Sequence, residues 1–208
     1  MKVCEIFVSI QGESSLVGIP MIFVRLTGCN LRCTYCDTKY AYYEGQELSI
    51  DEVLKKIHSF PFKYVEITGG EPLLQYEVYE LMNELVKTHM VLIETNGSVS
   101  LEKVNSQVKI IMDIKTPGSG MNEKNCLENL KILKETDEVK FVLTDRADYE
   151  WAKDFIKTHR IKAKEILFSP AYGILNPEEL AKWIINDGLL VRLNLQAHKY
   201  IFGDTRGV

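Results

Sequence analysis

Short apolar segments that alternate with helix-like segments constrain the fold of this chain more than any other feature. Seven runs rich in β-branched and aromatic residues predict strands at 22–26, 64–68, 90–94, 109–114, 139–143, 165–169 and 191–195. Strands that alternate with helices form βα units, which assemble into a mostly parallel sheet. We therefore predict an α/β fold.

Three of the intervening segments carry explicit helix signals. Ser49 and Glu52 form a capping box, the pattern of a helix N-terminus. Val78 begins an apolar stripe that continues at i+3, i+4, i+7 and i+8, as on one face of an amphipathic helix. Asn176 and Pro177 are typical of an N-cap followed by proline at the first helical position.

The length of the chain selects among α/β architectures. A closed (β/α)8 barrel has eight units and about 250 residues, whereas 208 residues hold six or so units. An open or partial barrel, or a doubly wound sheet, fits better. No long linker, repeat or low-complexity segment divides the chain, so we expect one domain over residues 1–208.

In such a fold, polar residues that follow the strands meet at one mouth. This predicts a shared site from residues 27–29, 68–72, 94–97, 113–115, Lys140, 169–170 and 196–198.

The cysteines and the charge limit where the protein works and what it binds. Three of the five cysteines fall within eight residues, whereas a secreted disulfide framework normally uses an even, dispersed set. The N-terminus lacks the apolar core of a signal peptide, and no apolar run approaches the roughly 20 residues of a membrane helix. With 25 basic and 29 acidic residues, the chain has a net negative charge, which disfavours binding to the phosphates of nucleic acid. We expect a cytoplasmic protein that binds neither membrane nor nucleic acid.

Cys29, Cys33 and Cys36 place three thiolates on one polar loop. Structural zinc sites use four ligands in two pairs, and no second pair exists here. Three thiolates suit a 4Fe-4S cluster that keeps one iron open. Two alternatives remain: a zinc site completed by His, and cysteines that serve as small apolar residues. Cys4 and Cys126 have no partner spacing, and we expect both to pack in the core.

The spacing Cys-x3-Cys-x2-Cys after the first long strand, with Tyr35 before the last cysteine, resembles the radical S-adenosylmethionine enzymes. Gly69-Gly70-Glu71-Pro72 follows the next strand, where that superfamily holds the methionine moiety. Paired glycines let a backbone approach a ligand closely, and Glu71 is expected to receive an ammonium group. The resemblance implies a cluster whose open iron binds the amino and carboxylate groups of S-adenosylmethionine, and a 5′-deoxyadenosyl radical that takes hydrogen from a substrate.

Further stretches resemble the 7-carboxy-7-deazaguanine synthase family from residue 5 to the C-terminus: 9–13, 18–20, 22–29, 36–38, 113–121 and 195–199. The resemblance implies ring contraction of 6-carboxy-5,6,7,8-tetrahydropterin to 7-carboxy-7-deazaguanine with loss of ammonia, in queuosine and deazapurine biosynthesis. It also implies catalytic use of S-adenosylmethionine, a need for Mg²⁺, an electron donor such as flavodoxin or ferredoxin, a homodimer, and a partial (β/α)6-type barrel. Members commonly have Gly where this chain has Ser14, which affects the local loop conformation.

The resemblance assigns site residues in three groups. The pterin is expected to contact Ile10, Gln11, Gly12, Glu13, Arg25, Thr68 and His198. S-adenosylmethionine is expected to contact Tyr35, Cys36, Asp37, Gly70, Asp113 and Lys115. Thr38 is expected to bind Mg²⁺, which accepts few protein ligands and keeps water and substrate oxygens, and residues 206–208 are expected to fold over the pocket.

Arg25 stands at a strand position where an apolar residue would be expected, and its planar guanidinium suits a carboxylate.

The main alternative function is a glycyl-radical enzyme activase, whose protein substrate needs no arginine that binds a carboxylate. A tRNA- or partner-binding module with structural zinc is a second alternative, disfavoured by the negative charge. The sequence shows no convincing paired-carboxylate arrangement.

Overall fold

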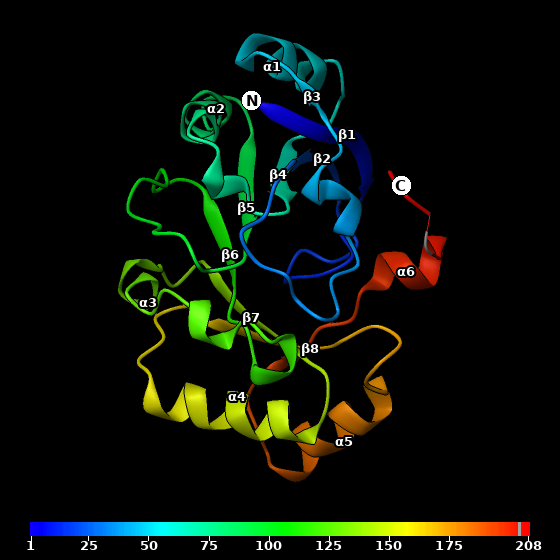
Figure 1. The fold of residues 1–208 in the computed structure, drawn as a ribbon, viewed down its shortest axis with the longest axis vertical. Coiled ribbons are helices and arrows are strands. Elements are labelled where there is room, and N and C mark those ends of the chain that lie inside the picture. The colour runs from blue at the N-terminus through cyan, green and yellow to red at the C-terminus, as the bar shows by residue number, and fades with distance from the viewer. Residues whose placement is uncertain (204) are drawn as a thin grey trace.

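The computed structural model describes residues 1–203 and 205–208. Its strands form one sheet in the order β3-β1-β2-β4-β5-β6-β7-β8-β9 (Figure 1). The strands are β1 (Lys2–Ile10), β2 (Pro20–Leu26), β3 (Gln46–Glu47), β4 (Tyr64–Gly69), β5 (Met90–Thr95), β6 (Lys109–Asp113), β7 (Glu138–Leu143), β8 (Glu165–Pro170) and β9 (Arg192–Leu193). From β2 to β9 every neighbouring pair is parallel, while β1 runs antiparallel to β2 and β3. The prediction of a mostly parallel α/β sheet is confirmed, as are all seven predicted strands.

Five helices lie between the strands: α1 (Ile50–His58), α2 (Glu77–Leu85), α3 (Asn129–Ile132), α4 (Arg146–Thr158) and α5 (Pro177–Asn186). A sixth described helix, α6 (Ala197–Phe202), follows β9. Figure 1 shows α1 and α2 beside one end of the curved sheet and α4 and α5 beside the other. Short 3₁₀ turns lie within the connecting segments: η1 (Lys39–Tyr42), η2 (Pro72–Leu74), η3 (Pro117–Ser119) and η4 (Asn122–Lys124). None of the described helices is long and apolar enough to span a bilayer.

The predicted helix signals have their expected geometry. The Ser49 hydroxyl accepts from the backbone N–H of Glu52, and the Glu52 carboxylate accepts from the Ser49 N–H, so the capping box is complete. The apolar stripe that begins at Val78 is buried along α2. At α5, the Asn176 side chain accepts from the N–H of Glu178. Apolar residues of these helices and the outward faces of the strands form one core.

The structure differs from the sequence-based prediction at the N-terminus. The nine-residue strand β1 was not predicted, because Cys4, Glu5 and Ser9 interrupt its apolar pattern. Its partly buried residues pair with β2. Cys4, on this strand, and Cys126, in a loop, are each only partly buried, so the expectation that both pack in the core is wrong. The Cys4 sulfur accepts a hydrogen bond from Arg206 at 3.4 Å, at the edge of the sheet.

The sheet does not close, since β3 and β9 are its two unpaired edges. The loop between β1 and β2, residues 11–19, reaches across it. Gln11 donates to Glu66 on β4, and the backbone N–H of Ser15 donates to Glu138 on β7 at 3.1 Å. This loop therefore bridges strands that do not pair with each other, as expected for a partial barrel.

Candidate active site

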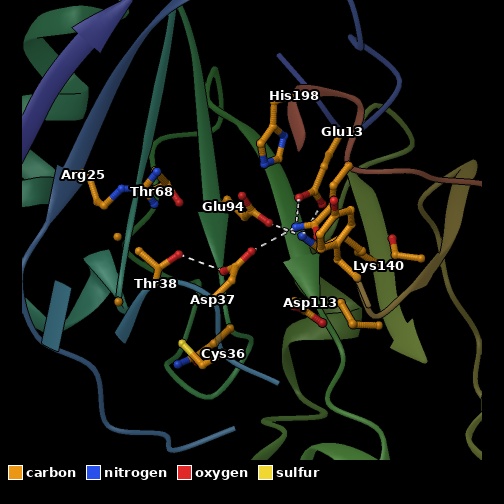
Figure 2. Close-up of a pocket in the computed structure, with 18 of the residues that line it drawn as sticks. Glu13, Arg25, Cys36, Asp37, Thr38, Thr68, Glu94, Asp113, Lys140 and His198 are labelled. Atoms are coloured by element: carbon orange, nitrogen blue, oxygen red, sulfur yellow. Dashed lines mark hydrogen bonds and ion pairs between the residues drawn. The ribbon is translucent and has the colours of Figure 1, made fainter. Parts of the chain in front are cut away.

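One pocket gathers all the residues that the sequence assigned to the cluster, the cofactor, the metal and the substrate. Its lining includes Ile10, Gln11, Gly12, Glu13, Arg25, Cys29, Cys33, Tyr35, Cys36, Asp37, Thr38, Thr68, Gly70, Asp113, Lys115 and His198. They come from the β1–β2 loop, the loop after β2, the carboxyl ends of the parallel strands and α6 (Figure 2). The predicted convergence of strand ends at one mouth is confirmed.

The three clustered cysteines lie in the loop between β2 and η1, and each sulfhydryl is free. Among the described residues, no three His, Cys, Asp or Glu side chains are grouped as ligands of a single metal ion. The thiols instead surround a shared pocket, and this donor set fits a multi-iron cluster in which each thiolate binds a different iron. Burial raises the pKa of the Cys33 thiol, and the nearby Lys115 ammonium opposes that rise.

Close backbone packing seats the glycine-rich loop against the cysteine loop. A Cβ on Gly70 would lie 2.7 Å from the carbonyl carbon of Gly28 and 2.8 Å from Cys29 Cβ, so only glycine fits. The N–H of Glu71 donates to the Gly28 carbonyl at 2.8 Å. Asn96 Nδ2 donates to Cys29 Sγ at 3.7 Å. Both loops that are expected to hold the cofactor are thus fixed relative to each other.

Glu71 itself does not face the pocket, which corrects the expectation that it receives an ammonium group. Its side chain is fully buried and accepts hydrogen bonds from the N–H groups of Leu73 (3.0 Å) and Asn96 (2.7 Å) and from the Thr95 hydroxyl (2.9 Å). Burial raises the pKa of Glu71 to about 6, although these hydrogen bonds oppose the rise. Glu71 therefore ties the glycine-rich loop to the end of β5.

Three buried polar atoms in the pocket have no hydrogen-bond partner among the described residues: Ser9 Oγ, Tyr35 Oη and Asp113 Oδ1. The other oxygen of Asp113 accepts from Lys115 Nζ at 2.7 Å. Burial lowers the pKa of Lys115, but the Asp113 charge outweighs it and raises that pKa above its usual range. Buried polar atoms are normally paired, so these atoms fit a polar ligand such as S-adenosylmethionine.

The loop that follows Asp113 docks on the cysteine loop. The Thr34 hydroxyl donates to the Gly118 carbonyl at 2.7 Å, and the Thr34 N–H donates to the Ser119 carbonyl at 3.1 Å. Asp148, in the first turn of α4, accepts from the Gly118 N–H at 2.7 Å. Helix α4 therefore positions this loop, and the loop supports the cysteines.

Arg25 is fixed by a charge network on β1. Its Nε donates to Glu5 Oε1 at 2.7 Å, and Glu5 also accepts from the hydroxyl of Tyr40 and from Arg206. Burial raises the pKa of Glu5, but the hydrogen bond and charge of Arg25 outweigh it and lower that pKa. Within the described residues the two terminal nitrogens of Arg25 have no hydrogen-bond partner, so they remain for an anion.

The C-terminal residues cover the same area. The Arg206 guanidinium lies 3.8 Å from the Tyr40 ring centroid and pairs with Glu44 at 2.7 Å. Val208 lines the pocket. Of residues 206–208, which were expected to fold over the pocket, Val208 lines it, whereas Arg206 contacts residues beside it.

Asp37 and Thr38 directly follow the last cysteine and line the pocket (Figure 2). The Thr38 hydroxyl donates to Asp37 Oδ1 at 2.9 Å, which leaves its oxygen lone pairs available for a cation. Lys199 pairs with Asp37 at 2.8 Å. Burial would raise the pKa of Asp37, but Lys199 and neighbouring donors lower it to about 2. Gln196 donates to both Asp37 and Glu13, so it joins the two loops.

His198, the second residue of α6, lies against Gly12. A Cβ on Gly12 would fall 2.7 Å from His198 Cγ and 2.8 Å from its backbone nitrogen. The N–H of Ala197 donates to the Gly12 carbonyl at 2.8 Å. The two predicted substrate residues are therefore packed together.

The sequence placed Glu94 and Lys140 at the shared mouth without assigning them a role, and it did not place the pocket residues Ser9 and Glu66 there. Lys140 Nζ contacts Glu94 and lies 2.9 Å from Glu13 Oε2. Glu66 is 2% exposed and lies in the middle of β4. A charged residue inside an otherwise apolar strand was the available signal, because burial of an unpaired charge is costly.

The strand order, the position of the pocket and the loop with three thiols are typical of a radical S-adenosylmethionine enzyme. In agreement, residues 23–118 match the sequence model of the Radical SAM superfamily. The chain is 46% identical, over its full length and 97% of the relative, to a 7-carboxy-7-deazaguanine synthase of Chlorobaculum tepidum. It is 45% identical to that of Koribacter versatilis over the whole of both chains. The chain belongs to the 7-carboxy-7-deazaguanine synthase family, and a 4Fe-4S cluster and S-adenosylmethionine follow from the superfamily.

Solved structures agree in fold. QueE from Escherichia coli superposes with a TM-score of 0.78 at 23% identity, covering 95% of this chain and 94% of that one. Streptococcus suis SuiB, solved with S-adenosylmethionine, has a TM-score of 0.54 at 16% identity over 84% of this chain and 45% of its own. The partial barrel is therefore shared well beyond the closer relatives.

Proposed function

We propose that this chain is a lyase that converts 6-carboxy-5,6,7,8-tetrahydropterin to 7-carboxy-7-deazaguanine with loss of ammonia. The supporting observation is a single pocket that holds three unpaired cysteines and an arginine with free terminal nitrogens. The product would feed queuosine and related deazapurines.

Cys29, Cys33 and Cys36 would hold the cluster, and its open iron would bind S-adenosylmethionine. When bound, the cluster would supply one-electron reduction of S-adenosylmethionine, the chemistry typical of the superfamily. The protein positions the reactants and excludes water. Tyr35, with its unpaired buried hydroxyl, and Asp113, with its unpaired oxygen, would bind polar groups of the nucleoside. Asp37, Gly70 and Lys115 line the same part of the pocket.

The terminal nitrogens of Arg25 would bind the pterin carboxylate as a planar fork. Gln11 and Glu13 would read the amino and amide edge of the ring, with Ile10 and Gly12 beside them. Thr68 and His198 line the same pocket and would contact the substrate.

Thr38 would supply one oxygen to Mg²⁺, whose other ligands would be water and the substrate carboxylate. The hydroxyl fits this role, because its proton is donated to Asp37 and its lone pairs are available. The cation would orient and polarise the substrate.

The remaining partners follow from the chemistry. The cluster needs an external reductant, and a flavodoxin or ferredoxin would provide it. Three free thiols require a reducing compartment, which supports a cytoplasmic location. We propose that the enzyme is a homodimer of single-domain chains and acts on free pterin, upstream of any RNA.

The test is an anaerobic assay of the reconstituted enzyme with the carboxytetrahydropterin, S-adenosylmethionine and reductant, with Mg²⁺ omitted and restored. A deazapurine chromophore is expected, with a rate that rises when Mg²⁺ is added. Thr38→Val, which keeps the shape but removes the oxygen, should lose that response. Absence of product with cluster, Mg²⁺ and reductant present would contradict the proposal and favour a glycyl-radical activase.

A further inference from the structure

The interior of the partial barrel holds more carboxyl groups than cations. Glu13 and Glu94 both contact the Lys140 ammonium, and Figure 2 shows the two carboxylates pointing toward it. Glu66, on β4, also lines this pocket but has no cation as a partner among the described residues. Its carboxyl accepts from the Gln11 amide.

Glu66 is the carboxyl in this pocket whose neutral form is most favoured. Burial and the negative charges of Glu94 and Glu13 raise its pKa well above the usual range. The positive charges of Lys140 and Arg25 oppose this rise but do not cancel it, since Lys140 is paired with two carboxylates and Arg25 with Glu5. The pocket therefore combines a carboxyl group that favours its neutral form with two carboxyl groups paired to a lysine, an arrangement that suits acid–base chemistry.

The proposed reaction requires such a pair after the radical steps end. Ring contraction leaves an amine on a saturated carbon of the new five-membered ring, and loss of ammonia then makes that ring aromatic. This elimination takes a proton from the neighbouring carbon and delivers a proton to the departing nitrogen. Neither transfer is part of the hydrogen exchange with 5′-deoxyadenosine.

We propose that Glu66 donates the proton to the departing amine and that Glu94 accepts the proton from the neighbouring ring carbon. This inference rests on the proposed function and assigns residues to its last step. The C–N bond breaks with its electron pair going to nitrogen, which takes the Glu66 proton and leaves as ammonia. The C–H electron pair forms the ring double bond, and its proton passes to Glu94.

The step is balanced, since no oxidant or reductant is consumed and one carboxyl loses the proton that the other gains. The side chain of Glu94 is 27% exposed at the pocket, and Glu66 lines the same pocket. Both return to their resting protonation by exchange with solvent after product leaves. Lys140 pairs with Glu94, while the pKa of Lys140, raised well above the usual range by Glu13 and Glu94 despite burial, makes the lysine a poor acid.

Glu66→Gln tests the assignment by separating the radical step from the elimination. With substrate deuterated at C6, deuterium entering S-adenosylmethionine counts radical events, and released ammonia counts eliminations. In Glu66→Gln the ratio of ammonia to transferred deuterium should fall by about a hundredfold or more, with an amine-bearing isomer of the substrate accumulating. Glu66→Asp keeps the acid and should retain more ammonia release, which preserves the test if the amide variant folds poorly.

A second readout needs no turnover. In the resting protein near neutral pH, infrared difference spectra of wild type against Glu66→Gln should show a neutral carboxylic-acid carbonyl stretch that the variant lacks. Glu138→Gln is the matched control: Glu138 is equally buried and anchors the same loop through Ser15, but it does not line the pocket. It should leave the ratio of ammonia to deuterium unchanged.

Two results would overturn the inference. One is a wild-type ratio of ammonia to deuterium in Glu66→Gln, and the other is a wild-type spectrum without the neutral carboxyl band. If wild type itself transfers no deuterium and releases no ammonia, the proposed function fails, and this outcome is separate from a failure of the Glu66 assignment.

Discussion

His198 lies where a side chain on residue 12 would have to go. A Cβ on Gly12 would be 2.7 Å from His198 Cγ, and the carbonyl of Gly12 accepts from the N–H of Ala197 at 2.8 Å. The β1–β2 loop and the start of α6 therefore close one side of the pocket as a fitted pair, although the chain places them at opposite ends.

Gly12→Ala should displace the imidazole. Overpacking of this kind costs about 1–3 kcal/mol of unfolding free energy, and the KM for the pterin should rise while the absorbance of the cluster stays unchanged. Urea unfolding of Gly12→Ala, His198→Ala and the double variant measures the coupling. The cost should be smaller without the imidazole, although the contact with the His198 backbone nitrogen remains. If the alanine costs as much without the imidazole as with it, the imidazole is not the cause.

Cys33→Ala should abolish the cluster, whereas Cys126→Ala should retain it. Cys33 lines the pocket with the other two thiols, and Cys126 does not. Iron content and visible absorbance after anaerobic reconstitution provide the measurement. Equal iron loss in both variants would contradict the division of the cysteines into three ligands and two others.

Lys140→Met should destabilise the protein by about 3–5 kcal/mol, because it leaves two mostly buried carboxylates without their counter-ion. The lysine side chain is 5% exposed. Lys87→Met is the control, since Lys87 pairs with Glu84 on the surface and exposed pairs contribute about 0–1 kcal/mol. Denaturant unfolding of both variants should show this difference, and equal losses would count against a buried charge network.

Glu71 should titrate near pH 6 in the folded protein, above its ordinary value of 4.5. Because burial disfavours the ionised form, the contribution of this group to stability should fall as pH rises from about 4.5 through about 6. NMR of ¹³C-labelled glutamate gives the midpoint, and Glu71→Gln should remove this part of the pH dependence. Glu52, whose pKa is lowered by its hydrogen bonds to Ser49, is the internal reference. A titration midpoint of Glu71 at or below 4.5 would contradict the raised pKa.

Arg25→Lys should raise the KM for the pterin by about tenfold or more. Lysine replaces a planar fork with a point charge, and a lost hydrogen bond to a charged group costs about 1.5–3 kcal/mol. Glu5→Gln, which keeps the guanidinium but weakens its anchor at 2.7 Å, should have a smaller effect. Steady-state kinetics at saturating S-adenosylmethionine would show this order, and an unchanged KM in Arg25→Lys would exclude a carboxylate clamp.

The sequence predicted the parallel strands and the residues of the pocket because local patterns encode both. Apolar β-branched runs define buried strands, and the motif residues follow them at the same end of the sheet. Strand β1 was missed because Glu5 and Ser9 break its pattern, and both have roles in the site: Glu5 anchors Arg25, and Ser9 lines the pocket. Functional residues disturbed the pattern that the prediction relied on.

The buried ion pairs of Lys140 with Glu13 and Glu94 could not be predicted from local sequence patterns. Glu13 and Lys140 pair across 127 positions of the chain, and the partial barrel alone brings them together. Glu66 was visible as an acid within an apolar strand, but its lack of a cationic partner follows only from the assembled pocket.

We propose that one pocket places the pterin against S-adenosylmethionine on the cluster. Single-turnover labelling with substrate deuterated at C6 tests it most directly, because hydrogen moves only between groups held in contact. Deuterium is expected in the recovered S-adenosylmethionine, together with 7-carboxy-7-deazaguanine and ammonia. Unlabelled S-adenosylmethionine and unchanged pterin, in a preparation whose cluster is intact and reduced, would contradict it.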